Sequence, residues 1–181
     1  PSALGASPIE IDGVAKGSPN YKDGVFVNLE SASPVSLSRQ EQFLLVREVI
    51  GGGSNQLPSA AVPLVTPDPS VAAGGLAVTW YGHSSAVIEV DGYRVLADPV
   101  WSDRCSPSRT VGPRRLHPVP APLEALPAID AVIISHDHYD HLDIDTVKQL
   151  ARTQRAKFFV PLGIGAHLRS WHIPADRIVE L

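Results

Sequence analysis

One stretch of this chain constrains its fold more than any other. The run at residues 129–134, Ile-Asp-Ala-Val-Ile-Ile, leads directly into a cluster of polar side chains. A short, mostly apolar run of this kind predicts a buried β-strand. Because a buried strand does not continue through unpaired polar side chains, we expect the chain to turn at the edge of a sheet. The cluster occupies six positions after this strand and contains His136, His138, Asp140 and His141.

The side chains of this cluster are those that bind divalent metal ions. Imidazole and carboxylate groups are the usual ligands of zinc and similar ions. An extended segment would bring only positions 136, 138 and 140 to one face, and a helix only 138 and 141, so a turn is required. Four ligands this close are too crowded for one ion, which favours His136 and His138 on one ion and Asp140 and His141 on a second. Paired ions about 3.5–4 Å apart can polarise a substrate oxygen and hold a hydroxide.

The alternative is a polar loop whose histidines only cap or hydrogen-bond. One histidine alone would be interpreted in that way, but three histidines and an aspartate after a buried strand favour a metal site. A catalytic zinc ion typically has three protein ligands, and this cluster offers two per ion. His167 and His172 have suitable chemistry, but their predicted positions on a helix and near a helix end favour other roles. We therefore expect the remaining ligands elsewhere.

From residue 76 onward the chain alternates between strand and helix patterns. Asp91 and Gly92 are a strong signal for a two-residue hairpin turn. Asp143 or Asp145 can cap a helix that follows the cluster. This order predicts an α/β fold that is antiparallel in its first half and alternating in its second, with a long loop at 98–127. Strands are expected at 76–81, 86–90, 93–97, 129–134, 157–160 and 178–181, and helices at 143–151 and 163–171.

The first 75 residues have a different character. They are rich in Pro, Gly and Ser, which predicts an irregular N-terminal arm. One short helix is expected within this arm, where Ser38 and Glu41 fit a capping box. Residues 76–181 form the compact part. A chain of 181 residues is long enough for one domain with its own core.

Composition excludes several classes of function. The net charge of −4 argues against a nucleic-acid partner, because there is no basic excess to neutralise phosphates. No uninterrupted apolar stretch approaches the roughly 20 residues of a membrane-spanning helix. The single cysteine, Cys105, rules out an internal disulfide, and we interpret it as a packing or loop residue.

The run His136-Asp137-His138-Tyr139-Asp140-His141 resembles the His-x-His-x-Asp-His signature of the metallo-β-lactamase superfamily. Within that superfamily, several shorter runs resemble the branch of N-acylphosphatidylethanolamine-hydrolysing phospholipase D. These runs are Gly82-His83, Asp98-Pro99-Val100, Ser106-Pro107-Ser108, Gly112-Pro113-Arg114-Arg115 and Phe159-Val160-Pro161-Leu162-Gly163. The resemblance covers about residues 76–181.

This resemblance implies a fold and a metal site. It implies the N-terminal half of an αββα sandwich, with two zinc ions or other divalent ions at one edge. His136 and His138 would bind one ion, and Asp140 and His141 the other. The family takes a third histidine for each site and a bridging aspartate from later in its chain. We therefore expect this sequence to be the N-terminal part of a longer protein whose C-terminal part supplies those ligands.

Further residues are candidates for supporting roles at this site. Asp98 and His83 follow predicted strand ends, and we expect them to orient metal ligands through hydrogen bonds. Arg114 and Arg115 have guanidinium groups that suit a phosphate, so we expect them to bind substrate. Asp140 would hold one ion and also orient the attacking hydroxide as a catalytic residue.

The expected function is therefore hydrolysis at two metal ions. The resemblance implies a phosphodiesterase of phospholipase D type, in which a hydroxide bridging two zinc ions attacks an N-acylphosphatidylethanolamine-like phospholipid. Three alternatives stay open: a lactone, ester or amide hydrolase with the same site, a sugar-phosphate lactonase, and a non-catalytic, envelope-associated metal-binding protein. We expect a location in the cytoplasm or at the periphery of a membrane, the second because the resemblance implies a lipid substrate. The sequence leaves a homo-oligomer open.

Overall fold

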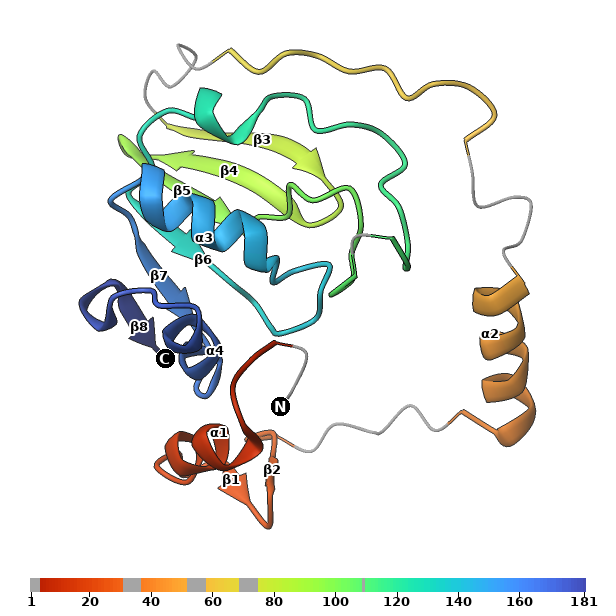
Figure 1. Ribbon diagram of the computed structural model, residues 1–181, viewed down its shortest axis with the longest axis vertical. Coiled ribbons are helices and arrows are strands. Elements are labelled where there is room, and N and C mark those ends of the chain that lie inside the picture. The colour runs from red at the N-terminus through yellow and green to blue at the C-terminus, as the bar shows by residue number, and fades with distance from the viewer. Residues whose placement is uncertain (1–3, 31–36, 52–57, 69–74, 109) are drawn as a thin grey trace.

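The computed structural model describes residues 4–30, 37–51, 58–68, 75–108 and 110–181. Its centre is a six-stranded sheet whose strands lie side by side in the order in which they occur in the chain (Figure 1). These strands are β3 (Leu76–Gly82), β4 (Ser85–Val90), β5 (Tyr93–Ala97), β6 (Ala131–Ile133), β7 (Lys157–Val160) and β8 (Ile178–Glu180). The helices are α1 (Pro8–Ala15), α2 (Arg39–Gly51), α3 (Ile144–Thr153) and α4 (Ile164–Ser170), with short 3-10 turns at Leu123–Ala125 and Ala175–Arg177.

The pairing of the strands changes at β5. The β3–β4 and β4–β5 pairs are antiparallel, and the three pairs from β5 to β8 are parallel. Asp91 and Gly92 join β4 to β5 with φ values of 49° and 84°, and a type I′ hairpin turn requires positive φ at both positions. The predicted α/β fold with an antiparallel first half is therefore confirmed. Since β5 to β8 run parallel, their carboxyl ends share one edge of the sheet.

One face of the sheet is buried beneath α3 (Figure 1). A row of buried side chains crosses this face at paired positions, namely Val87, Leu96, Val132 and Phe158. The helix begins at the N-cap Asp143, whose carboxylate accepts a hydrogen bond of 3.1 Å from the backbone N–H of Asp145. Of the two predicted caps, Asp143 is thus the one used. The helix continues to Thr153 and buries Val147 and Leu150 in the core.

The opposite face of the sheet is apolar and open. Trp80 and Ile133 lie on this face and are 56% and 43% exposed. Leu76 and Val78 of β3 are also exposed. None of the described segments buries these four side chains. A sheet with a helix on one face and an uncovered apolar surface on the other agrees with the predicted N-terminal half of a sandwich.

The first described segment packs on the last helix. Ser7 and Glu10 form a capping box that begins α1, and a two-stranded hairpin of β1 (Tyr21–Lys22) and β2 (Val25–Phe26) follows. The indole Nε1 of Trp171 donates a 2.7 Å hydrogen bond to the carbonyl of Leu4, which is buried. The irregular structure expected before residue 38 is thus partly replaced by regular elements, because contacts with residues far along the chain stabilise them.

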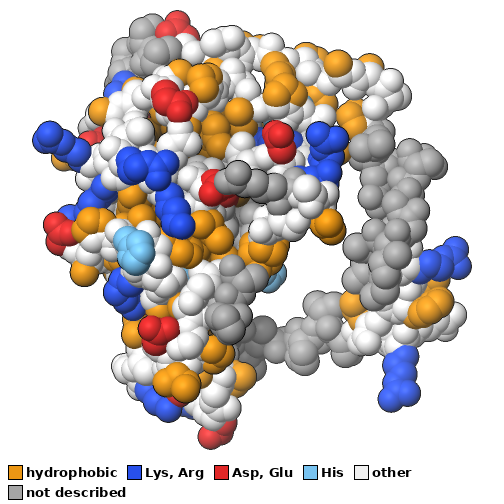
Figure 2. All heavy atoms as spheres, in the orientation of Figure 1, with side chains coloured by type: hydrophobic (Ala, Val, Ile, Leu, Met, Phe, Trp, Pro, Cys, Tyr) orange, Lys and Arg blue, Asp and Glu red, His pale blue; other side chains and the backbone are white. Residues whose placement is uncertain are grey.

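The rest of the N-terminal arm contributes α2, which lies apart from the sheet in Figure 1. The predicted capping box is present, because the backbone N–H of Ser38 donates to Glu41 and that of Glu41 donates to Ser38 Oγ. Residues 1–3, 31–36, 52–57 and 69–74 of the predicted arm lie outside the described residues. Acidic and basic side chains are both spread over the face shown in Figure 2. Among the helices that the structure describes, none has the length and apolar character needed to cross a membrane.

Candidate metal centre

The candidate site lies at the carboxyl edge of the sheet, directly after two neighbouring strands. β5 ends immediately before Asp98, and β6 ends shortly before the cluster of histidines. The backbone N–H of Asp98 donates to the carbonyl of Ile133 at 2.9 Å, which keeps the two strand ends together. Asp98 has a φ of 40°, a conformation that is uncommon outside glycine and tends to occur at functional sites. Its side chain is consequently directed at the loop after β6.

The loop is held at both ends by buried apolar side chains. Ile134 precedes the cluster with 1% exposure, and Leu142 follows it with none. Between them, the backbone N–H groups of His141 and Leu142 both donate to the carbonyl of His138, at 2.9 and 2.8 Å. These bonds close a tight turn. The turn gathers the imidazoles: the ring centroid of His136 lies 4.0 Å from that of His141 and 4.6 Å from that of His138.

Asp98 organises these imidazoles through three hydrogen bonds. Its Oδ1 accepts from the backbone N–H of Ser135 at 2.7 Å, and its Oδ2 accepts from Ser135 Oγ at 2.8 Å and from His141 Nδ1 at 2.9 Å. An ionised carboxylate only accepts, so the proton of His141 is on Nδ1 and Nε2 is left with a free lone pair. The hydroxyl of Ser135 donates its one proton to Asp98. Its oxygen can therefore only accept from His136, whose Nδ1 lies 2.9 Å away. Both rings thus present an unprotonated Nε2, the form that binds metal.

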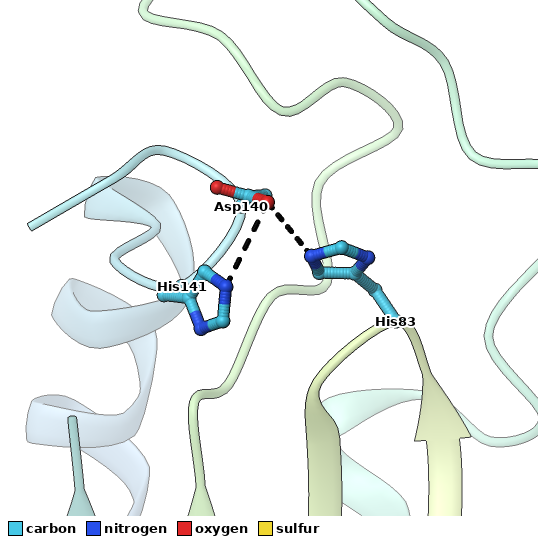
Figure 3. Close-up of side chains that lie close together, drawn as sticks. All are labelled: His83, Asp140 and His141. Carbon is cyan, nitrogen blue, oxygen red and sulfur yellow. Dashed lines mark hydrogen bonds and ion pairs between the residues drawn. The ribbon is translucent and has the colours of Figure 1, made fainter. Parts of the chain in front are cut away.

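Asp140 lies between two imidazoles that come from different parts of the chain (Figure 3). Its Oδ2 is 2.7 Å from Nε2 of His83 and 3.7 Å from Nε2 of His141. Ligand atoms of His83, Asp140 and His141 all lie within 4.8 Å of one another. Burial alone would raise the pKa of Asp140, but hydrogen bonds from its own backbone and from His83 hold that pKa below its ordinary value. The carboxylate is therefore ionised at neutral pH, as a metal ligand must be.

These donors fit a divalent ion by their chemistry. Imidazole nitrogens and an ionised carboxylate oxygen suit zinc, iron or manganese. The two histidines whose tautomers are determined by Asp98 and Ser135 are prepared for coordination without rearrangement. The loop still offers only two predicted ligands per ion. Apart from His83, no His, Cys, Asp or Glu side chain from the other described segments joins Asp140 and His141 within this distance.

The two predicted substrate-binding arginines differ in their surroundings. Arg115 is partly buried, and its guanidinium donates to the carbonyls of Val100 at 2.7 Å and Tyr81 at 2.9 Å. Burial lowers the pKa of this group. Arg114 is exposed, and its backbone forms an isolated bridge with Arg104. Arg115 therefore holds the loop against the end of β3 and the segment that follows β5, while Arg114 keeps its guanidinium on the surface.

The remaining histidines and the cysteine lie in packing or surface positions. His167 is 2% exposed, and its Nδ1 accepts a 3.3 Å hydrogen bond from the backbone N–H of Ala6. His172 is exposed and has a φ of 67°. Burial raises the pKa of the Cys105 thiol, and the charge of Asp140 adds to this effect, so Cys105 is a poor nucleophile.

Sequence reasoning missed one member of the network. Ser135 bonds Asp98 through both its backbone N–H and its hydroxyl, and it also contacts the ring of His136. Its position between the buried strand and the first histidine was a usable signal. The decisive partner, however, lies 37 positions earlier in the chain, and only the pairing of β5 with β6 brings the two together.

Comparison with known proteins gives consistent matches. Residues 93–181 match a family described as "Beta-lactamase superfamily domain". An uncharacterised protein of Mycobacterium tuberculosis is 61% identical over 182 residues, covering all of this chain and 49% of that protein. N-acyl-phosphatidylethanolamine-hydrolyzing phospholipase D 1 of Caenorhabditis elegans is 42% identical over 113 residues, covering 62% of this chain and 32% of that protein.

A third relative is named only by a general activity. It is a metal-dependent hydrolase of an Anaeromyxobacter species, 34% identical over 109 residues, which cover 60% of this chain and 35% of that protein. The chain spans about half the length of the mycobacterial relatives that it matches.

Proposed function

Because residues 93–181 belong to the metallo-β-lactamase superfamily, we propose that this protein is a metal-dependent hydrolase. The observation that carries the proposal is the set of hydrogen bonds from Asp98 through Ser135 and His141, which leaves metal-binding nitrogens free at the edge of the sheet. In this proposal His136 and His138 hold one ion, and Asp140 and His141 hold a second. The chemistry that such a pair of ions supplies is polarisation of a substrate oxygen and a lower pKa for water.

The residues of this chain have separate tasks in the proposal. Asp98 keeps the rings of His136 and His141 in the required tautomers, directly for His141 and through Ser135 for His136. Asp140 contributes a negative charge that offsets part of the charge of the ions. We propose that the ligands still lacking come from the region of the longer relatives that this chain does not span. The open apolar face around Trp80 and Ile133 supports this, because none of the described segments buries these side chains and a further layer of the protein could cover them.

The proposed substrate is a phosphodiester of an N-acylphosphatidylethanolamine-like phospholipid, and the proposed metal is zinc. The name of the nematode relative supports this substrate class. The exposed guanidinium of Arg114 lies in the loop that packs beside the ends of β3 and β5, where it can bind a phosphate. Peripheral contact with a membrane follows from such a substrate and is part of the proposal.

One observation favours a second candidate, a hydrolase of uncharged lactone, ester or amide bonds. The guanidinium of Arg115 is occupied by two backbone carbonyls, so one of the two predicted phosphate contacts is already used within the fold. The name of the Anaeromyxobacter relative specifies a metal-dependent hydrolase and no phosphate. A substrate without a charged phosphate would need fewer cationic contacts.

The test is an assay of the full-length purified protein on N-acylphosphatidylethanolamine in mixed micelles, with release of N-acylethanolamine as the readout. Exhaustive chelation should abolish release, and added zinc should restore it. His138→Ala should lower the rate by more than about 100-fold, because even residues that only orient metal ligands are worth 10–100-fold. His172→Ala, at an exposed histidine outside the site, is the control. Parallel assays of lactone and thioester substrates decide between the two candidates, and activity that survives both chelation and His138→Ala refutes the metal-dependent mechanism.

A further inference from the structure

The turn between β3 and β4 contacts the candidate metal centre. His83 and Ser84 form this turn, and both bond Asp140, which lies more than fifty positions later in the chain. Nε2 of His83 is 2.7 Å from Asp140 Oδ2, and Ser84 Oγ donates to the backbone carbonyl of Asp140 at 3.2 Å. Figure 3 shows the contact between His83 and the side chain of Asp140. The side chain and the main chain of Asp140 are thus held from the same turn.

The turn itself is anchored in an unfavourable conformation. His83 has a φ of 49° and follows Gly82, whose φ is 115°. A left-handed conformation costs a residue with a side chain roughly 1–2 kcal/mol. Trp80 stabilises it by donating from Nε1 to the carbonyl of His83 at 2.8 Å. Strain of this kind persists where the surrounding contacts maintain it, and it concentrates at functional positions.

The distances distinguish a metal ligand from a residue that orients one. Two donor atoms bound to one tetrahedral ion at about 2.0–2.2 Å lie roughly 3.3–3.6 Å apart. The 3.7 Å between Asp140 Oδ2 and His141 Nε2 is close to that separation, so one ion can join these atoms. The 2.7 Å between Asp140 Oδ2 and His83 Nε2 is too short for two ligands of one ion and is typical of a hydrogen bond.

We propose that the His83–Ser84 turn is a positioning element that orients Asp140, so that Asp140 Oδ2 and His141 Nε2 bind the same ion. In this arrangement His83 donates to the carboxylate without binding the metal. The inference rests on the proposed function, because it assumes that Asp140 and His141 share an ion. It adds a role for a turn that lies outside the histidine-rich loop and reaches it only through the folding of the sheet.

The test compares two asparagine variants of the full-length protein. Asparagine tolerates the left-handed conformation but is too short to reach Asp140, so His83→Asn removes the hydrogen bond and preserves the turn. His172→Asn is the matched control, because His172 is also exposed and has a φ of 67°. His83→Gln tests rescue, since its longer amide can donate to the carboxylate. The readouts are Zn²⁺ affinity by competition with a chromophoric chelator and the visible spectrum of the Co²⁺-substituted protein.

We expect His83→Asn to bind one of the two ions 10–100-fold more weakly, the range for groups that orient ligands. Its Co²⁺ spectrum should change, and its melting temperature without metal should stay near that of the unmodified protein. His83→Gln should recover part of the affinity, and His172→Asn should match the unmodified protein. Unchanged affinity in His83→Asn would overturn the proposal, as would loss of a whole metal equivalent in both His83→Asn and His83→Gln, which would identify His83 as a ligand.

The outcomes separate this inference from the proposed function. If the unmodified protein binds no metal, the proposed metal-dependent hydrolysis fails and the inference fails with it. If the unmodified protein binds two ions and is active, while His83→Asn behaves identically, only the role of the turn is refuted. Ser84→Ala removes the bond from the same turn to the backbone carbonyl of Asp140, and it should weaken the binding of the same ion and not of the other one.

Discussion

Replacing Asp98 by asparagine should weaken the binding of one metal ion while leaving the fold intact. The backbone N–H of Ser135 cannot turn away, so the amide oxygen of the new side chain must take the place of Oδ1 and accept from it. The amide nitrogen then occupies the position of Oδ2, which lies 2.9 Å from Nδ1 of His141. Since that nitrogen only donates, Nδ1 must become an acceptor. The imidazole proton moves to Nε2, the atom that would bind the ion.

The size of this effect follows from the bond that is lost. A hydrogen bond to a charged group is worth about 1.5–3 kcal/mol. The variant must give up its preferred tautomer before His141 can coordinate, so we expect the ion shared with Asp140 to bind about 10–100-fold more weakly, or roughly 1.4–2.7 kcal/mol. Asparagine also suits the φ of 40° at this position, so the backbone should be retained.

Two measurements check this prediction. Nitrogen-15 NMR of the metal-free protein reports the tautomer of His141, which should change from Nδ1–H to Nε2–H. Chelator competition reports the affinity for zinc. Asp130→Asn is the control, because Asp130 also accepts a 2.7 Å hydrogen bond from a backbone N–H, that of Arg94, outside the metal centre. Undiminished zinc affinity together with an unchanged tautomer in Asp98→Asn would show that the proposed network does not control coordination.

Other substitutions separate stability from function. Arg115→Ala should lower the free energy of unfolding by roughly 2–3 kcal/mol, because two backbone carbonyls lose their donor; Arg114→Ala should change it by less than about 0.5 kcal/mol yet slow hydrolysis of a phosphodiester. Burial lowers the pKa of His167, so the unfolded chain takes up a proton that the folded protein does not, and stability is lost as pH falls below about 6.5. Between about pH 7.5 and 5, the melting temperature of His167→Asn should therefore fall by less than that of the unmodified protein. Gly163→Ala should cost about 2 kcal/mol in urea unfolding, because φ is 92° and the new Cβ would lie 2.8 Å from Ile11 Cγ2.

The sequence predicts the sheet well where local patterns determine structure. The strand at 93–97 and the one at 157–160 have the predicted bounds, and the Asp91–Gly92 turn joins the expected strands. The run at 129–134 yields a strand of only three residues, Ala131–Ile133. Ile134 is still buried and bonded to β7, but the chain is already leaving the strand pairing there. Apolar character therefore extends past the regular element into the start of the loop that carries the histidines.

Features that depend on distant contacts were harder to predict. The capping box of Ser7 and Glu10 was readable in the sequence, yet α1 offers few buried apolar side chains of its own, and its packing partner is α4. Arg115 carries the same charge as Arg114, and nothing local distinguishes the guanidinium that turns inward. The bonds from Asp98 and His83 to the loop likewise depend on which strand ends become neighbours.

The order of the strands has a consequence for how this protein is made. Each strand from β4 to β8 pairs with the one before it, so every strand that leaves the ribosome finds its partner already synthesised. The segment at 4–15 has no such advantage, since α4 is translated about 150 residues later. At about 5–20 residues per second the delay is roughly 7–30 seconds. During synthesis this segment therefore docks only after strands β3 to β7 have been made, and a protease would find it accessible until α4 has emerged.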